Sequence, residues 1–399
     1  MTPTATTPPT SMPNHILSDQ VLSQCAERAA IYDRENRFFS EDFELLRQVG
    51  YLLAAVPKEL GGLGLSLSQI CQEQRRLAYR SAATALGTNM HIVATAVAAD
   101  LYRKGDHSLK WLLQEAVSGE IFAYGYGETG NDVGVLYSTT KAERADGGYR
   151  FIGHKIFGTL TPVWTRFIIH GADTSNPNAP KIVHGIMRRD SPGYHIKETW
   201  DTLGMRATRS EDTVLEGVVV PDRYIARVVS PGWAPDEYVL TIFGWGMPTF
   251  GAIYTGIAER ARDLVIASVK KKTSVAGMTR SMAYHPEVQH AIAAMTLEVE
   301  AMRPHLERIA DDWSNGVDHG DQWPAKLVGL KHHCVEGAKK VVDLAMEVSG
   351  GASMFKRNEL ERLYRDVRCG GFHPANSALV LEIVGKTALG VLGEEPRWG

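Results

Sequence analysis

The stretch LGMRATRSEDTVLEGVVVP, residues 203–221, decides how the rest of the chain is divided. Its second half is rich in β-branched residues and predicts a strand over 213–220. Further short β-rich runs precede it, at 149–151, 167–170 and 182–186. Turn residues such as Asp146-Gly147-Gly148 separate these runs. Residues 121–235 are therefore predicted to form a β domain.

Helical periodicity dominates on both sides of this β region. Phe43, Leu46 and Val49 are spaced for one helix face. From Val288 to Ile309, apolar residues recur at alternating intervals of four and three positions, which also places them on one helix face. A second stripe, within 327–348, indicates a neighbouring helix of a packed bundle. The order helical (15–120), β (121–235), helical (236–399) excludes a doubly wound sheet, in which strands alternate with helices. Residues 1–14, rich in Thr and Pro, are expected to be a disordered tail without the pattern of a signal peptide.

Composition favours a small-molecule partner. The chain has 399 residues, 44% of them hydrophobic, and a formal charge of -3, so no strong field would attract nucleic acid or an anionic membrane. Its four cysteines lie far apart, which argues against a disulfide framework and for a cytoplasmic protein. The histidines show no ligand spacing, so no metal is expected.

Several separated motifs, in a fixed order, resemble those of the acyl-CoA dehydrogenase superfamily. They are residues 203–221, the glycine-rich turn 56–64, the segment YGYGETGNDV at 124–133 and the segment GHKIFGT at 153–159. The resemblance covers nearly the whole chain after the tail. It implies a mainly α fold with an N-terminal helical domain, a middle β-barrel or sandwich and a C-terminal four-helix bundle.

The same resemblance implies a flavin site, with FAD expected and FMN possible. Glycines at 125 and 127 would let backbone N–H groups approach a polar ring edge, and Phe157 would offer a stacking face. On the residues alone, a turn at 124–133 and a core aromatic at Phe157 are the favoured reading, and the ordered family resemblance reverses that preference. The implied cofactor-binding residues are Tyr124, Tyr126, Gly127, Asn131, Phe157 and Thr159, together with Lys271, Thr273, Glu347, Gly350 and Gly351 reaching from a neighbouring subunit.

The two positions where this superfamily holds its catalytic carboxylate carry Pro374 and Gly246. Neither can take a proton from a substrate carbon, so ordinary desaturation has lost its base. The chain is more similar here to the monooxygenase branch, typified by dibenzothiophene monooxygenase and indole hydroxylases. That resemblance implies catalytic roles for His373, His91 and Thr159. Each histidine alone is more often structural.

The expected function is therefore a monooxygenase that receives reduced flavin from a separate reductase, forms a C4a-hydroperoxide with O2 and hydroxylates an apolar aromatic or heteroaromatic substrate. Trp245, Phe243, Phe250 and Phe372 are candidate lining residues, although core packing explains them equally well. A homotetramer is expected. Two alternatives stay open: a dehydrogenase or oxidase whose base is Glu128 or Asp132, and a non-catalytic flavin-binding homologue.

Overall fold

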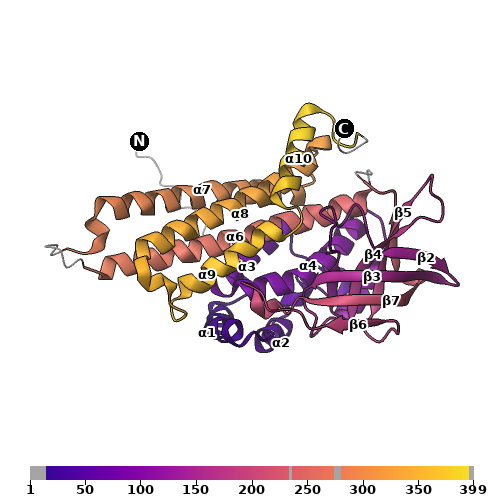
Figure 1. Ribbon diagram of the computed structural model, residues 1–399, viewed down its shortest axis with the longest axis horizontal. Helices are drawn as coiled ribbons and strands as arrows, with labels where there is room; N and C mark the ends of the chain where they lie inside the picture. The colour runs from indigo at the N-terminus through magenta and orange to yellow at the C-terminus, as the bar shows by residue number, and fades with distance from the viewer. Residues whose placement is uncertain (1–14, 233–235, 274–279, 395–399) are drawn as a thin grey trace, which may run out of the picture.

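The structure is a computed structural model that describes residues 15–232, 236–273 and 280–394. The predicted tail therefore lies outside the described residues. A long helical bundle forms one end of the molecule and a sheet the other, with the N-terminal helices packed between and below them (Figure 1). This is a mainly helical fold with a central sheet domain, as predicted.

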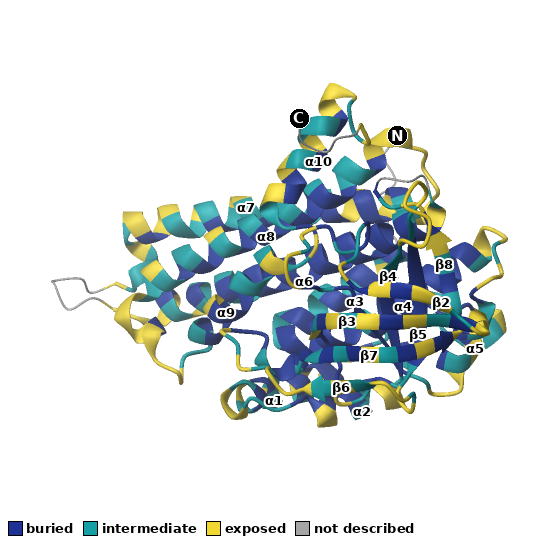
Figure 2. Ribbon diagram, turned by 45° about the vertical axis from the view of Figure 1, so that its right-hand side comes forward, coloured by how far each residue is buried: buried dark blue, intermediate teal, exposed yellow. Residues whose placement is uncertain are grey.

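The N-terminal region folds as five α-helices. They are α1 (Asp19–Glu35), α2 (Ser40–Gln48), α3 (Leu67–Arg80), α4 (Ala82–Arg103) and α5 (Lys110–Val117). A capping box between Ser66 and Gln69 fixes the start of α3. By length and composition α4 could cross a membrane, but 94% of its most apolar window is buried in the protein. It is the central helix of this region, and both α3 and α6 pack against it (Figure 2).

The β region forms one curled sheet in the order β6-β7-β3-β2-β4-β5-β8, with β1 paired to β4. The strands are β1 (Phe122–Gly125), β2 (Lys141–Ala145), β3 (Gly148–Gly158), β4 (Arg166–Asp173), β5 (Lys181–Arg188), β6 (Tyr194–Lys197), β7 (Glu211–Pro221) and β8 (Ile225–Val229). A Cβ added at Gly185 of β5 would lie 3.1 Å from Phe151 and 3.3 Å from Val220 of β7. The sheet therefore closes around buried Phe151, because β5 and β7 face each other across this ring.

The C-terminal region is a bundle of long helices. It contains α6 (Glu237–Lys271), α7 (Pro286–Ser314), α8 (Trp323–Ser349), α9 (Glu359–Arg368) and α10 (Ser377–Leu389). The predicted stripes are its core, since Met295, Val299 and Leu327 are fully buried. The first four helices run along one another and α10 projects away from them (Figure 1).

Candidate active site

The exit from β3 presents the first predicted site residue, Phe157. This ring is 53% exposed and packs edge-to-face on Trp200, with the ring centroids 6.0 Å apart. Phe157 and Leu160 both have positive φ angles, of 58° and 68°. Such angles are uncommon for residues other than glycine and cluster at functional sites. The turn therefore holds an aromatic face out of the sheet, where a planar ring could stack on it.

Thr159 belongs to a chain of three hydroxyls. Its Oγ1 lies 2.7 Å from Ser210 Oγ, which in turn lies 2.8 Å from Thr208 Oγ1. All three residues are buried. The Thr208 hydroxyl donates to the carbonyl of Met205 at 2.9 Å, which orients the row of three hydroxyls. Sequence analysis missed Thr208 and Ser210 as partners of Thr159, although both stand in the stretch that decided the fold.

This β-domain stretch is tied to the bundle beside the predicted catalytic histidine. The Met205 amide donates to Asp366 Oδ1 at 2.7 Å, and Arg365 Nη1 donates to the Leu203 carbonyl at 3.0 Å. Gly204 approaches α9 so closely that an added Cβ would lie 2.4 Å from the Arg365 carbonyl oxygen. Because α9 leads directly into the segment with His373, the two halves of the site have a common anchor.

His373 is held by two residues of α6. Its Nε2 lies 2.7 Å from the Tyr254 hydroxyl, and its ring stacks on Phe250 with a centroid distance of 4.8 Å and an interplanar angle of 3°. Burial, with a smaller effect of nearby Lys331, lowers the pKa of His373 to about 3. Burial raises the pKa of Tyr254 well above its ordinary value. The imidazole is therefore neutral at physiological pH. When the Tyr254 hydroxyl donates to Nε2, the single ring proton is on Nδ1, which can then donate to another group.

The face of α6 that contacts His373 has unfilled space beside one buried glycine. Gly246, Phe250 and Tyr254 follow one another at steps of four residues, so they share one side of the helix. Gly246 is buried, yet a Cβ added there would meet no described atom within 4 Å. By contrast, a Cβ at Gly244 would lie 2.2 Å from the Trp313 ring. The helix thus leaves room at Gly246, one turn before Phe250, on the side of α6 that contacts His373.

Neither family position for the carboxylate is filled. Pro374 is exposed, and Gly246 has no side chain. Of the alternatives, Glu128 is fully engaged: Oε1 accepts from Lys155 Nζ and Thr140 Oγ1, both at 2.6 Å, and Oε2 accepts from the Thr139 amide at 2.8 Å. Although burial alone would raise the pKa of Glu128, the charges of Lys155 and His170 and these hydrogen bonds hold it far below its ordinary value. A carboxylate held this way is a poor proton acceptor. Asp132 is exposed on the adjoining turn.

The Tyr124–Asn131 segment is built as a rigid edge. Tyr126 is buried, and its hydroxyl lies 3.0 Å from His184 Nδ1 and 3.1 Å from the Tyr238 hydroxyl, so its ring belongs to the interior. Asn131 Nδ2 donates to Glu128 Oε2 and to the Tyr137 carbonyl, both at 2.8 Å. A Cβ at Gly127 would lie 2.6 Å from the Ile156 carbonyl oxygen, so only glycine fits there. In this segment the backbone, and the half-buried Tyr124, are the groups left to meet a cofactor.

His91 lies apart from His373. It is 1% exposed on α4, and its Nδ1 accepts from the Phe122 amide at 3.0 Å. Burial lowers its pKa to about 4, so it too is neutral. This contact ties the start of β1 to α4. A catalytic role for His91 remains a prediction.

The predicted aromatic lining divides into three kinds of environment. Trp245 is 2% exposed and donates its indole N–H to Asp100 Oδ2 at 2.9 Å. Phe243 is also buried, and Phe250 lies under His373. Phe372, in contrast, is 79% exposed. Phe250 and Phe372 flank His373, whereas Trp245 has a structural contact.

The predicted second-subunit residues lie far from His373 in the same chain. Lys271 ends α6, Thr273 follows it, and Glu347, Gly350 and Gly351 surround the end of α8; all five are exposed. Both helix ends lie at the end of the bundle opposite the sheet (Figure 1). Within one chain they do not meet Phe157 or His373.

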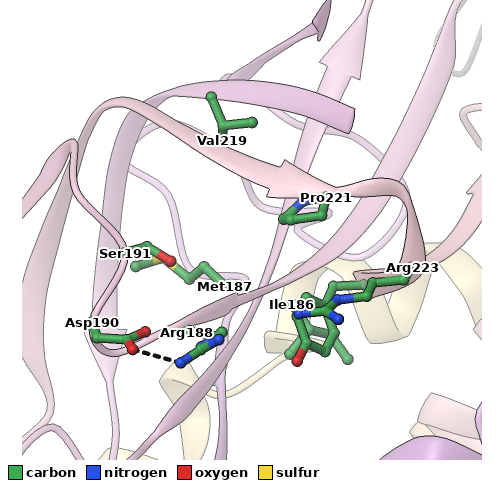
Figure 3. A pocket seen from close by; sticks show the side chains of 9 residues that line it. Ile186, Met187, Arg188, Asp190, Ser191, Val219, Pro221 and Arg223 are labelled. Carbon is green, nitrogen blue, oxygen red and sulfur yellow. Dashed lines mark hydrogen bonds and ion pairs between the residues drawn. The ribbon is translucent and has the colours of Figure 1, made fainter. Parts of the chain in front are cut away.

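One surface hollow lies away from these residues. It measures about 300 Å³ and lies between β5, the end of β7 and the turn with Arg223 and Tyr224 (Figure 3). Its lining consists of Ile186, Met187, Arg188, Asp190, Ser191, Val219, Pro221, Arg223 and Tyr224. None of the predicted site residues lines it. The hollow is therefore separate from the predicted active-site residues.

Comparison with known proteins gives the family. Two family models match, described as acyl-CoA dehydrogenase, N-terminal domain, over residues 17–120 and acyl-CoA dehydrogenase, C-terminal domain, over residues 248–378. The chain belongs to the acyl-CoA dehydrogenase family. The predicted family membership is therefore confirmed.

The similar proteins carry names of two kinds, acyl-CoA dehydrogenase and nitrososynthase. YdbM of Bacillus subtilis (strain 168), whose name describes it as an acyl-CoA dehydrogenase, is 29% identical over 89% of this chain and 91% of its own length. The amino sugar nitrososynthase DnmZ of Streptomyces peucetius is 30% identical over 90% of this chain and 88% of its own. The structure of KijD3 in complex with FMN and an amino-keto sugar nucleotide shares the fold, with a TM-score of 0.83, 23% identity and coverage of 96% and 95%. The family match and the two sequence relatives support oxidation chemistry for this chain, and the likeness to KijD3 shows its fold.

Proposed function

We propose that this protein is a two-component flavin monooxygenase, which uses reduced flavin from a separate reductase and O2 to oxygenate a small organic substrate. One observation carries the proposal: a neutral histidine, His373, stands beside the place where dehydrogenases of the family hold a carboxylate, and neither carboxylate position is filled. Without a base the site cannot take an α-proton. A preorganised hydrogen-bond donor suits the stabilisation of developing charge on oxygen instead.

The residues present fit a flavin. Phe157 offers an exposed ring face, and the Thr159 hydroxyl lies two residues further on. When bound, the reduced flavin supplies the activation of O2. The protein's own contribution is to place the His373 donor against that ring and to keep water out with Phe250 and Phe372. The FMN in the KijD3 structure suggests FMN as well as the expected FAD.

Two substrate classes follow from different observations. An apolar aromatic or heteroaromatic ring is favoured by the stacked pair Phe250–His373 and by exposed Phe372. Oxygenation of an amine nitrogen is favoured by the name of DnmZ, an amino sugar nitrososynthase that this chain matches over most of its length. Both classes present an electron-rich atom to the same activated oxygen.

We further propose that the protein works as a homotetramer in the cytoplasm. The exposed second-subunit residues at the far end of the bundle would then reach the flavin of another copy. Lys271 would supply a point charge for phosphate, without the two-pronged geometry of arginine.

The test is turnover with enzymatically reduced FMN or FAD, O2 and a panel of indoles, phenols and amino sugars, followed by mass spectrometry for oxygen addition. The parent should form an oxygenated product, and His373→Ala should lose about a hundredfold in product formation while releasing hydrogen peroxide. His195→Ala is the matched control, because this histidine is exposed on β6 and pairs only with Glu216 at 3.3 Å. Rapid anaerobic bleaching of oxidised flavin by an acyl-CoA thioester would overturn the proposal in favour of a dehydrogenase. Flavin binding without bleaching or oxygen-dependent product would instead indicate a non-catalytic homologue.

A further inference from the structure

The segment between α9 and α10, which carries His373, is built around one buried lysine. Lys331 of α8 is 2% exposed, and its Nζ donates to three backbone carbonyls: Gly370 at 2.8 Å, Ala375 at 2.9 Å and His373 itself at 3.0 Å. These carbonyls span residues 370–375. One side chain therefore sets the path of the whole segment.

Lys331 has no carboxylate in contact among the ion pairs of the described residues. The other fully buried lysine, Lys155, lies 2.6 Å from Glu128. Burying a charge without a counter-charge is costly, and an apolar residue of similar length would avoid this cost. A buried cation in such a place marks a candidate functional position.

The three carbonyls account for the charge chemically. An ammonium group has three N–H donors and a neutral amine has only two, so three acceptors are satisfied only by the protonated form. Burial, with Lys339 adding to it and Glu336 opposing it, lowers the pKa of Lys331 to about 7. The three carbonyls accept hydrogen bonds from the ammonium group, so they favour the protonated form and oppose this lowering of the pKa.

His373 is thereby fixed from two sides. Lys331 holds its backbone from α8, while Tyr254 and Phe250 hold its ring from α6. If the carbonyls were released, the ring could keep its contacts with α6 only by straining the segment, and its free nitrogen would move relative to the flavin. A displacement of about 1 Å at a catalytic group can cost on the order of a hundredfold in rate.

We propose that Lys331 is the positioning residue for His373, an ammonium whose three hydrogen bonds set where the imidazole stands in the active site. This proposal rests on the proposed function for the role of His373. The geometry of the segment can also be tested without it.

The experiment compares Lys331→Met, which removes all three donors at similar length, with Lys340→Met on the same helix. Lys340 is exposed and pairs with Glu298 at 2.7 Å, so it controls for loss of a lysine from α8. Hydrogen–deuterium exchange should rise roughly tenfold or more in peptides covering 369–376 of Lys331→Met and stay unchanged in the β domain. Unchanged exchange at 369–376 would overturn the proposal, whatever reaction the protein catalyses.

The second readout is coupling, the ratio of oxygenated product to hydrogen peroxide. Lys331→Met should keep its flavin affinity within about twofold and lose product roughly tenfold to a hundredfold. The double variant Lys331→Met/His373→Ala should be no worse than His373→Ala alone, because both changes remove the same placed imidazole. Losses that multiply would show that Lys331 acts independently of His373 and would overturn the proposal.

Lys331→Gln covers the case in which Lys331→Met does not fold, because its amide keeps two N–H donors. It should show intermediate coupling and intermediate exchange. If the parent and Lys340→Met form no oxygenated product with any substrate, the proposed function fails, while the exchange result still decides the role of Lys331.

Discussion

The two fully buried lysines show two ways of keeping a cation inside one protein. Lys155 in the β domain lies against the carboxylate of Glu128, and burial lowers its pKa to about 8. Lys331 in the bundle meets only carbonyls, and its pKa falls to about 7. The first is a closed pair that rigidifies the Tyr124–Asn131 edge. The second fixes the path of residues 370–375, the segment that carries His373.

The largest effect is expected from breaking the closed pair. Glu128→Gln keeps the shape but leaves the Lys155 charge unpaired at 0% exposure, and should lower the free energy of unfolding by about 3–5 kcal/mol. Urea unfolding measures this loss. The double variant Glu128→Gln/Lys155→Met removes the stranded charge and should regain part of it. If Glu128→Gln is as stable as the parent, Lys155 does not depend on its carboxylate partner, and the proposed difference between the two lysines is wrong.

Acid should weaken the β domain, in part through the buried neutral histidine His184. Burial lowers the pKa of His184 to about 3, against about 6.5 in the unfolded chain. Between these values the unfolded chain binds the extra proton, so stability falls as pH falls below 6.5, by roughly 1.4 kcal/mol per unit. Urea unfolding at pH 6.5, 5.5 and 4.5 tests this. His184→Gln should reduce the slope by one proton, and an unchanged slope would show that His184 is protonated in the fold.

The open side of the bundle can be tested with two glycines of one helix. Gly246→Ala places a methyl group where no described atom lies within 4 Å and should be neutral or stabilising by up to about 1 kcal/mol through helix propensity. Gly244→Ala meets Trp313 at 2.2 Å and should cost about 1–3 kcal/mol. Thermal unfolding of both variants gives the comparison. Equal costs would mean that the space beside Gly246 is closed.

The smallest effect is expected at the hydroxyl chain. Ser210→Ala removes the partner that lies 2.7 Å from Thr159 Oγ1 and should cost about 1 kcal/mol of stability. If the Thr159 hydroxyl faces the flavin, its release should also change flavin affinity, measured by fluorescence titration. Thr161→Ala is a control in the same turn, since that hydroxyl donates to the Gly158 carbonyl at 2.5 Å and not to the Thr159–Ser210 pair. Equal flavin affinities in both variants would place Thr159 outside the cofactor site.

Sequence patterns predicted the helical, β, helical order well because apolar periodicity reports which face of each element is buried. The stripe Val288–Ile309 and the run 213–220 both became core elements for this reason. The buried polar contacts could not be predicted in this way. Lys331, Tyr254 and Ser210 look ordinary in sequence, and they gain their roles only from neighbours on other elements. For Tyr254, the four-residue steps from Gly246 and Phe250 were a usable signal.

The most direct test mixes the reduced-flavin-loaded protein with O2 in a rapid-scan spectrophotometer. If the protein is a monooxygenase guided by His373, reduced flavin should disappear quickly while the oxidised spectrum returns only after a delay. His373→Ala should abolish this delay and release hydrogen peroxide at once. An oxidised spectrum that returns without delay in the parent, as it does with free flavin, would contradict the account.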